Sequence, residues 1–281
     1  MSARIDSAID LAVSHFLPEA AHAALVVVHG LAEHRGRYAG LAGRCRDAGL
    51  ATVTYDQRGH GESPGRRCDI DRFATFAGDL RAVIAATAAS LPTLPVFVWG
   101  HSLGCLVALD CLLSNRGAAL CLVTTGCPLA AFGAAAERLG PAAAWLGGLL
   151  PALRLPTSLD ARKLSHDPVV QAHYRGDPLV QHSLTLRLAG ETARAVVRVR
   201  GDIARLDTAC LALHGAEDEI APPAGSRRLI EDAGHADRRL VELPGYRHEV
   251  HNEERGDRFL ELLLGWVDER VHATVGRPAT A

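Results

Sequence analysis

The stretch VFVWGHSLG, residues 96–104, is the most informative part of the sequence, because it runs from an apolar segment into a serine with a glycine two residues away on each side. The pattern Gly-x-Ser-x-Gly occurs in many proteins, but here a strand pattern precedes it and a helical pattern follows it over 103–115. A serine between two such elements is held in a sharp, strained turn that lifts its hydroxyl above a sheet. The stretch therefore predicts that Ser102 is a nucleophile. An ordinary helix-capping serine would not require glycine on both sides.

Apolar runs alternate with helical patterns along most of the chain on both sides of this turn. Continuous apolar runs are typical of buried parallel strands, and they occur at 25–28, 51–55, 96–99, 120–125, 211–213 and 240–243. Helical patterns separate or follow them at 37–49, 73–90, 103–115, 223–233 and 255–271. This alternation predicts an α/β protein with a mostly parallel central sheet and helices on both faces.

One long interval, residues 129–205, interrupts the alternation. It contains no convincing strand pattern, and it becomes polar and helical over 160–200. Such a long connection is uncommon in a compact domain unless it carries function. We therefore expect a helical cap inserted over the carboxyl ends of the strands, between core parts 1–128 and 206–281 of one catalytic domain. The alternative is that these helices pack on one face of the sheet.

The composition narrows the classes of function. The chain has 281 residues, 48% of them hydrophobic, and a formal net charge of −2. This describes a globular protein without the basic surface expected for nucleic-acid binding. Its seven cysteines form no Cys-x-x-Cys pair, and neither a leader-like start nor a long apolar segment is visible. We therefore expect reduced thiols and a cytoplasmic location. No metal-binding or phosphate-binding motif occurs, so no metal or cofactor is expected.

A nucleophilic serine needs a base and an acid that orients the base, and in this kind of fold they follow in the order Ser, acid, His. Asp218 follows the run 211–213 in the sequence HGAED, residues 214–218. Its short side chain after the Gly-Ala turn suits an acid that points inward, fixes the imidazole tautomer and stabilises the imidazolium. Glu217 and Glu219 are the alternatives.

The base is expected on the loop after the last strand. His248 ends the sequence PGYRH, residues 244–248, and lies five residues past the run 240–243. A loop of this length brings an imidazole over the sheet edge, where it accepts the serine proton and passes it to the leaving group. His251 is an alternative, whereas His235 precedes the strand and would lie at its wrong end.

Two backbone N–H groups are expected to stabilise the negative charge that develops on the substrate oxygen. Leu103 follows the nucleophile at a helix N-terminus, where N–H groups are unpaired and negative charge is favoured. Leu31 follows His29-Gly30 at the end of the first strong strand pattern. Its amide is the natural second donor of an oxyanion hole.

Two longer motifs complete a resemblance to the monoacylglycerol lipase family of α/β-hydrolases, also described as lysophospholipase-like or serine-aminopeptidase-type hydrolases. HGLAEHRGRY, residues 29–38, is similar to the family's HGxxEHxGRY, and DQRGHGESPG, residues 56–65, is similar to its DxRGHGxSxG. The resemblance covers roughly residues 20–272. It implies an α/β-hydrolase fold with a cap, and it implies the roles given above to the three catalytic residues and the two leucine amides.

The resemblance also implies polar residues around the alcohol end of the substrate. By motif position these are Glu33, Arg37, His101 and His251, with Tyr174 of the insertion as a further candidate. For each of them a purely structural role is the alternative. Glu33 and Arg37 suit a loop-ordering ion pair equally well, and His251 suits a supporting position behind the site.

Other motif residues are expected to be structural. Asp56, Arg58 and His60 read as scaffolding of a loop. Cys105 stands where the family usually has a second glycine after the serine motif, and a small buried thiol is the expectation there.

The start of the insertion, residues 142–155, is rich in leucine and contains Trp145. The expectation is that it lines an acyl tunnel, and packing onto the sheet is the alternative. Contact with a membrane surface is a further possibility. Because only Arg138 and Arg154 flank the segment, such contact would be weak.

Together these features predict a serine carboxylic ester hydrolase, a carboxylesterase or acylglycerol lipase acting on monoacylglycerols or similar single-chain lipid esters. The alternatives that keep the same three catalytic residues are a lysophospholipase, a thioesterase or an aminopeptidase. A non-enzymatic binding protein of the same fold is disfavoured by the intact Ser, Asp and His in the expected order.

Overall fold

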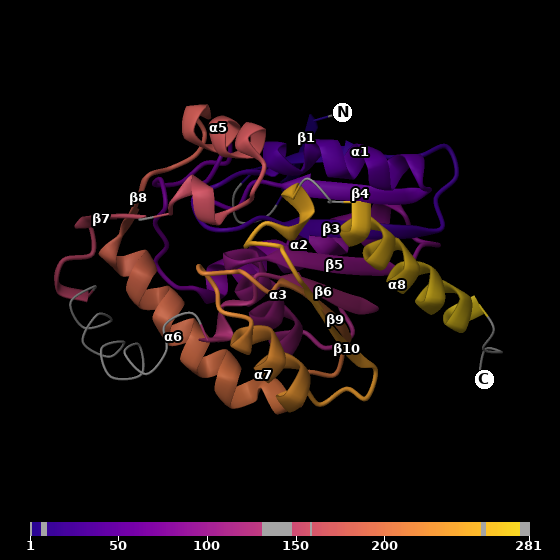
Figure 1. The fold of residues 1–281 in the computed structure, drawn as a ribbon. Helices are drawn as coiled ribbons and strands as arrows, with labels where there is room; N and C mark the ends of the chain where they lie inside the picture. Colours follow the sequence, from indigo (N-terminus) through magenta and orange to yellow (C-terminus); the bar gives the residue numbers. More distant parts are fainter. Residues whose placement is uncertain (1, 7–9, 131–147, 158, 254–256, 276–281) are drawn as a thin grey trace.

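The computed structural model describes residues 2–6, 10–130, 148–157, 159–253 and 257–275. Within them, eight strands form one sheet in the spatial order β1-β2-β4-β3-β5-β6-β9-β10 (Figure 1). The strands are β1 (Ser2–Asp6), β2 (Asp10–Phe16), β3 (Ala23–Val28), β4 (Leu50–Tyr55), β5 (Val96–His101), β6 (Cys121–Thr125), β9 (Ala209–Gly215) and β10 (Arg238–Leu243). From β4 to β10 all neighbours are parallel, while β1 and β2 pair antiparallel at one edge. The predicted α/β-hydrolase architecture with a mostly parallel sheet is confirmed.

Helices cover both faces of this sheet. The helices of the described residues are α1 (Ala39–Asp47), α2 (Ala74–Ser90), α3 (Leu103–Ser114), α5 (Pro168–Gly176), α6 (Leu186–Asp202), α7 (Ala224–Asp232) and α8 (Asp257–Val275), and all but α5 pack on the sheet. Side chains on α2, α3, α6 and α7 join one buried cluster, and side chains on α1 and α8 join another. Val26 and Val28 of β3 belong to the first cluster, and Leu25 and Val27 to the second. This division follows from the two-residue period of a strand buried on both faces.

The two N-terminal strands were not expected from the sequence. β2 is buried only along Leu11, Ala12 and Val13, and its later residues are partly exposed. An antiparallel strand near a sheet edge therefore lacks the continuous apolar run by which the central strands were recognised. The small antiparallel ribbon of β7 (Arg154–Pro156) and β8 (Ser183–Thr185) was also missed, because three residues are too few to carry a pattern.

The insertion behaves in two different ways. α6 packs along α3, and its Leu188, Ala195, Val196 and Val199 are part of the core cluster on that face. α5 and the turn before it instead form a small separate cluster of Ala161, Leu164, Tyr174 and Val180. The second half of the insertion thus supplies a further helix of the core, while its middle reaches toward the loops at the carboxyl ends of the strands.

Candidate active site

The nucleophile turn joins β5 to α3 with no intervening residues except Ser102. Ser102 has φ 52° and ψ −117°, a conformation that non-glycine residues adopt only when the surroundings enforce it. A Cβ on Gly100 would come within 2.7 Å of the Cys105 Cα, and one on Gly104 would overlap the carbonyl oxygen of Val28. Both glycines are therefore needed for the strand and helix to approach. Cys105 itself is fully buried, and burial raises the pKa of its thiol.

An aspartate and a histidine from two different loops meet at this edge of the sheet. The Nδ1 of His248, on the loop after β10, donates to Oδ2 of Asp218, on the loop after β9, at 2.7 Å. Burial alone would raise the pKa of Asp218, but the neighbouring imidazoles outweigh it and hold that pKa well below its usual range. In His248 burial lowers the pKa, yet the Asp218 carboxylate outweighs it, and the net shift is upward.

The alternative acids and bases from the sequence lie elsewhere. Glu219 pairs with Lys163 at 2.8 Å, and Glu217 lies 3.5 Å from the His166 ring, with both carboxylates exposed. His235 precedes β10, and its ring accepts from the amide of Asp237.

A second histidine holds the same aspartate oxygen, and the sequence reasoning passed over it. His214 ends β9, and its Nε2 lies 3.1 Å from Asp218 Oδ2 and 2.7 Å from the carbonyl oxygen of Ala221. Its Nδ1 lies 2.7 Å from the Ser226 hydroxyl. Because a carbonyl only accepts, Nε2 carries the proton. The available signal was that His214-Gly215 repeats the strand-ending His-Gly of residues 29–30.

Leu31 and Leu103, whose amides are the expected oxyanion donors, both line the same cavity as Ser102. Within the described residues, neither amide donates a hydrogen bond to a protein acceptor. Gly30 lies close to Ser102, since a Cβ on it would be 3.3 Å from the Ser102 Cβ. Two unpaired donors beside a serine hydroxyl have the arrangement of an oxyanion hole.

The cavity holds about 210 Å³. The core contributes Gly30, Leu31, His101, Ser102, Leu103 and His248, and the insertion contributes Thr157, Leu159, Leu164, Tyr174 and Thr192. The insertion therefore forms one wall of the space in front of the nucleophile, as a cap would. The phenol oxygen of Tyr174 is buried and has no hydrogen-bond partner among the described residues.

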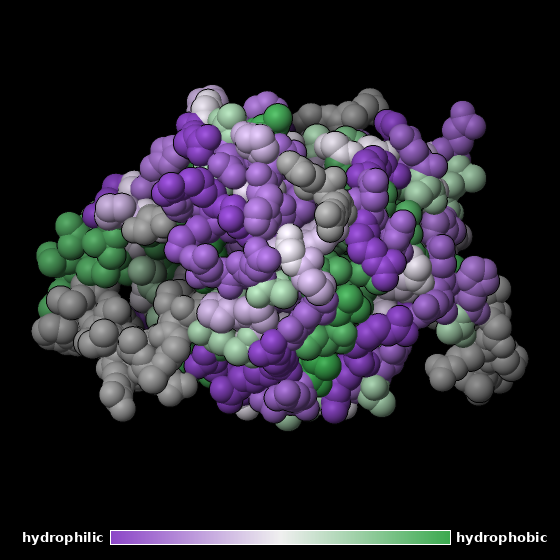
Figure 2. All heavy atoms as spheres, viewed as in Figure 1, coloured by the Kyte–Doolittle hydropathy of each residue, from purple (hydrophilic) through white to green (hydrophobic). Residues whose placement is uncertain are grey.

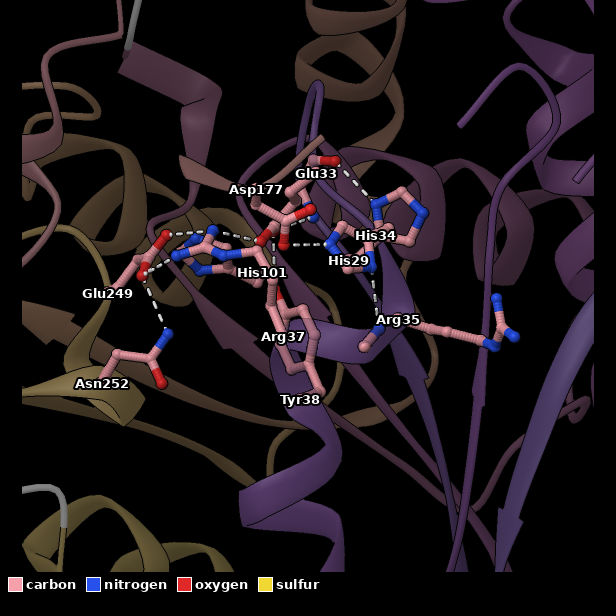
Figure 3. Close-up of polar contacts among 12 residues, drawn as sticks. His29, Glu33, His34, Arg35, Arg37, Tyr38, His101, Asp177, Glu249 and Asn252 are labelled. Atoms are coloured by element: carbon pink, nitrogen blue, oxygen red, sulfur yellow. Dashed lines mark hydrogen bonds and ion pairs between the residues drawn. The ribbon is translucent and has the colours of Figure 1, made fainter. Parts of the chain in front are cut away.

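A buried ion-pair cluster forms the polar side of the cavity (Figure 3). Arg37 donates to Glu33 at 2.6 Å and to both oxygens of Glu249 at 2.7 and 2.8 Å. Burial would raise the pKa of Glu249, but the Arg37 guanidinium outweighs it and lowers that pKa to about 2. The guanidinium also lies 4.9 Å from the centre of the Tyr174 ring. The ion pair considered for Glu33 and Arg37 exists, and both residues also line the cavity.

The two remaining histidines of the expected alcohol site have different positions. His101 lines the cavity, holds the Thr125 hydroxyl through Nδ1 at 2.9 Å, and lies 4.7 Å from the His248 ring. His251 is stacked on Tyr38 at 5.0 Å, behind His101. The structure does not place His251 among the residues that line the cavity. Its expected contact with substrate is therefore not found, because aromatic packing holds the ring in the interior.

The leucine-rich start of the insertion also differs from expectation. Residues 131–147, including Trp145 and Arg138, lie outside the described part of the chain. The four described leucines are Leu149, Leu150, Leu153 and Leu155, and their exposed fractions run from 38% to 59%. They do not line the cavity beside Ser102. Leu155 lies in β7 and the other three precede it closely in the chain. Figure 2 shows a hydrophobic patch at the left edge of the molecule, where Figure 1 labels β7.

Comparison with known proteins identifies the family of the chain. Residues 19–255 match the family described as serine aminopeptidase, S33. The chain is 34% identical over 247 residues to a monoacylglycerol lipase of Mycolicibacterium smegmatis, covering 86% of this chain and 87% of that protein. It is 30% identical to the monoglyceride lipase of Homo sapiens, covering 90% and 84% of the two chains.

The solved structures agree with the sequence comparison. The crystal structure of Paleococcus ferrophilus monoacylglycerol lipase superposes with a TM-score of 0.81 at 29% identity, over 92% of this chain and 98% of that one. Within the described residues, no helix is long and apolar enough to cross a membrane. The chain therefore belongs to the serine aminopeptidase S33 family of α/β-hydrolases, and it is homologous to monoacylglycerol lipases.

Proposed function

We propose that this protein is a serine carboxylic ester hydrolase that cleaves monoacylglycerols or similar single-chain lipid esters. One observation carries the proposal: the strained Ser102 shares a cavity wall with His248, and the other ring nitrogen of His248 is held by Asp218 at 2.7 Å. Catalysis by Ser, His and Asp requires a serine and a histidine that face the same space and an aspartate that holds the far side of the imidazole. The roles follow from the chemistry of each group.

In the first half of the reaction, Ser102 Oγ attacks the ester carbonyl carbon while His248 Nε2 takes the hydroxyl proton. The carbonyl electron pair moves to oxygen, where the Leu31 and Leu103 N–H groups donate to it. The intermediate then collapses, and the bond to the alcohol breaks as His248 returns the proton to the leaving oxygen. The products of this half are a free alcohol and an acyl group on Ser102.

In the second half, a water molecule takes the place of the alcohol. His248 accepts a proton from this water as it attacks the acyl carbon, and the same two amides hold the oxyanion again. Collapse releases the carboxylic acid and returns the proton to Ser102. Asp218 stays ionised throughout and stabilises the imidazolium, in line with the low pKa of its carboxyl group.

The charges of the cavity favour a neutral alcohol over a phosphate. In the buried ion-pair cluster, Arg37 already donates to Glu33 and Glu249, so two carboxylates surround one guanidinium. A phosphate needs free donors and would meet excess negative charge. A glycerol hydroxyl instead finds the unpartnered Tyr174 hydroxyl and carboxylate oxygens as acceptors. This favours a monoacylglycerol over a lysophospholipid.

The apolar side of the cavity suits the acyl chain. Pro128, Leu159, Leu164 and Ile220 line it opposite the ion pairs. The exposed leucines near β7 suit shallow contact with the lipid aggregate from which such a substrate comes. Only Arg154 lies among the described leucines, and it is engaged by Ser183 and the Arg67 carbonyl, so electrostatic attachment would be weak.

The decisive experiment compares hydrolysis of 2-monoacylglycerols of increasing chain length, the matching lysophosphatidic acids, acyl thioesters and p-nitrophenyl esters. We expect the monoacylglycerol to exceed the lysophosphatidic acid of equal chain length, and a fluorophosphonate to label wild type but not Ser102→Ala. Retained turnover in Ser102→Ala would reject the mechanism. Faster hydrolysis of the lysophosphatidic acid or of the thioester would reject the substrate assignment but leave the serine mechanism standing.

A further inference from the structure

The imidazole of His29 is held between two backbone groups directly behind the oxyanion loop. His29 follows β3, is 1% exposed, and does not line the cavity. Its Nδ1 lies 2.8 Å from the carbonyl oxygen of Gly30, and its Nε2 lies 3.0 Å from the amide nitrogen of Gln57. The His29 ring takes no part in the proposed reaction steps of Ser102, His248 and Asp218.

The two backbone partners fix the protonation of the ring. The Gln57 amide only donates, so Nε2 is the acceptor, and the Gly30 carbonyl only accepts, so Nδ1 carries the proton. Burial lowers the pKa of His29 to about 4, although Asp56 acts in the opposite sense. The ring is therefore neutral near pH 7 and has one donor, which it gives to Gly30.

The bound carbonyl belongs to the peptide that supplies the oxyanion donor. The structure contains no cis peptide bond among its described residues. In a trans peptide, the C=O of Gly30 and the N–H of Leu31 point in opposite directions. Because His29 lies outside the cavity and holds the carbonyl, the Leu31 N–H points toward the cavity and Ser102. If the carbonyl were released, rotation of this peptide would replace the donor with an acceptor.

The backbone next to the Gly30–Leu31 peptide is strained. Ala32 has φ 64°, a left-handed conformation that costs a non-glycine residue energy. Other contacts hold the same turn: Glu33 Oε1 accepts from the Gly30 amide at 2.5 Å, the Gln181 amide of the insertion donates to the Ala32 carbonyl at 2.8 Å, and the Gln57 side chain donates to the His29 carbonyl at 2.7 Å. Of these contacts, only the one from the His29 ring acts on the carbonyl of the Gly30–Leu31 peptide.

We propose that His29 is a positioning residue that keeps the Leu31 N–H turned into the oxyanion hole by holding the Gly30 carbonyl from behind. The inference rests on the proposed serine hydrolase mechanism, since it assigns a role to one amide of that mechanism. It predicts that loss of the His29 donor weakens stabilisation of the transition state, where the oxyanion exists. Binding of the ester substrate should be unaffected.

Two substitutions separate this role from general support of the fold. In His29→Asn the amide nitrogen takes about the place of Nδ1, so the donor to Gly30 is kept and the acceptor for Gln57 is lost. In His29→Gln the amide group takes about the place of Nε2, so the donor to Gly30 is lost. His60→Gln is the matched control, because His60 is a fully buried imidazole 5.3 Å from His29 that contacts the Arg58 carbonyl instead.

The measurements are kcat and KM for a p-nitrophenyl ester, together with the inhibition constants of a trifluoromethyl ketone and its methyl ketone. Ser102 adds to the trifluoromethyl ketone, its proton passes to His248, and the carbonyl oxygen becomes an oxyanion, whereas the methyl ketone stays unreacted. We expect His29→Gln to lower kcat about 10²-fold, as loss of one oxyanion donor does. Affinity for the trifluoromethyl ketone should fall in parallel, with KM and methyl ketone binding nearly unchanged. His29→Asn and His60→Gln should keep most of kcat, corrected for the folded fraction.

Equal losses of kcat in His29→Asn and His29→Gln would overturn the proposal, and so would an unchanged kcat in His29→Gln. A loss in His60→Gln as large as that in His29→Gln would also overturn it, because the effect would then belong to the core. Ser102→Ala in the same assay tests the proposed function separately, since its outcome does not depend on His29.

Discussion

Two loops at the carboxyl edge of the sheet carry the same kind of residue and do different things. Asp56 follows β4 and Asp218 follows β9, and both are buried. Asp56 accepts from the amides of Arg35 and Glu62 at 2.7 and 2.8 Å and pairs with the Arg35 guanidinium. Asp218 accepts from two amides on one oxygen and from two imidazoles on the other.

The difference lies in the partner and in its access to the cavity. Arginine stays charged at every ordinary pH, so the bond between Asp56 and Arg35 fixes a loop and does nothing else. Histidine changes its charge near pH 7, and His248 lines the cavity with Ser102. We therefore expect a buried aspartate after a parallel strand to act in catalysis only where a titratable partner reaches the substrate.

The largest expected effect is on catalysis at the second loop. Asp218→Asn should lower kcat about 10⁴-fold, because the amide favours the wrong imidazole tautomer and gives no charge to stabilise the imidazolium. Steady-state hydrolysis of a p-nitrophenyl ester measures it. A loss below about tenfold would mean that Asp218 is scaffolding, as Asp56 is.

The next largest effect is on the free energy of unfolding, and it concerns the buried ion-pair cluster of Arg37, Glu33 and Glu249. Arg37→Met should lower the free energy of unfolding by about 3–5 kcal/mol, because it leaves Glu33 and Glu249 buried without their cation. Urea denaturation followed by circular dichroism measures it. Arg44→Met is the control, since Arg44 makes an exposed pair with Asp257 and should change stability by less than about 1 kcal/mol.

In the loop of Asp56 we expect the opposite result from Asp218→Asn, with a loss of stability and little change in kcat. Asp56→Asn should lower the free energy of unfolding by about 2–3 kcal/mol, because Arg35 loses a buried partner but keeps Glu62. At a temperature where the variant is folded, kcat should remain within about threefold of wild type. A large fall in kcat with little loss of stability would erase the distinction between the two loops.

The pH dependence separates the loops in a third way. His248 must be neutral to accept the serine proton, and its pKa is raised above the usual 6.5. Activity should therefore be lost as the pH falls through a value above 6.5. Asp218→Asn removes the carboxylate that raises this pKa while burial still lowers it, so the acid limb of kcat/KM should move to lower pH.

The profile of Asp56→Asn provides the control for this shift. Its acid limb should coincide with that of wild type, because Asp56 touches neither His248 nor Ser102. A matching shift in both variants would point to a general electrostatic effect of removing a carboxylate.

Local patterns in the sequence single out the three residues that we propose to be catalytic. The turn around Ser102 depends on two glycines and two flanking elements, all within the continuous segment 96–114. Asp218 and His248 each follow a recognisable strand at the end where parallel strands meet. Adjacent carboxylates such as Glu219 could be set aside only in part, because the direction of a loop side chain depends on the completed fold.

The missed features depend on contacts between distant segments. His214 contacts Asp218 directly and is itself held by Ser226 and Ala221, a set that the sequence does not single out. His251 was expected at the substrate, but Tyr38 and Trp99 from other parts of the chain enclose it. The same holds for the insertion, where the pattern gave helices but not which of them would pack on α3.

The smallest expected effect concerns leucines, and it extends the comparison from carboxylates to apolar side chains. Leu188 of α6 is buried in the core, whereas Leu149 and Leu150 are more than half exposed. Leu149→Ser with Leu150→Ser should change the free energy of unfolding by less than about 0.5 kcal/mol, because neither residue is buried. Leu188→Ala, the control, should lower it by about 2–5 kcal/mol. The double variant should hydrolyse a dissolved p-nitrophenyl ester as wild type does, but bind neutral phosphatidylcholine vesicles less, as measured by co-sedimentation. Unchanged vesicle binding would show that these leucines do not meet the lipid surface.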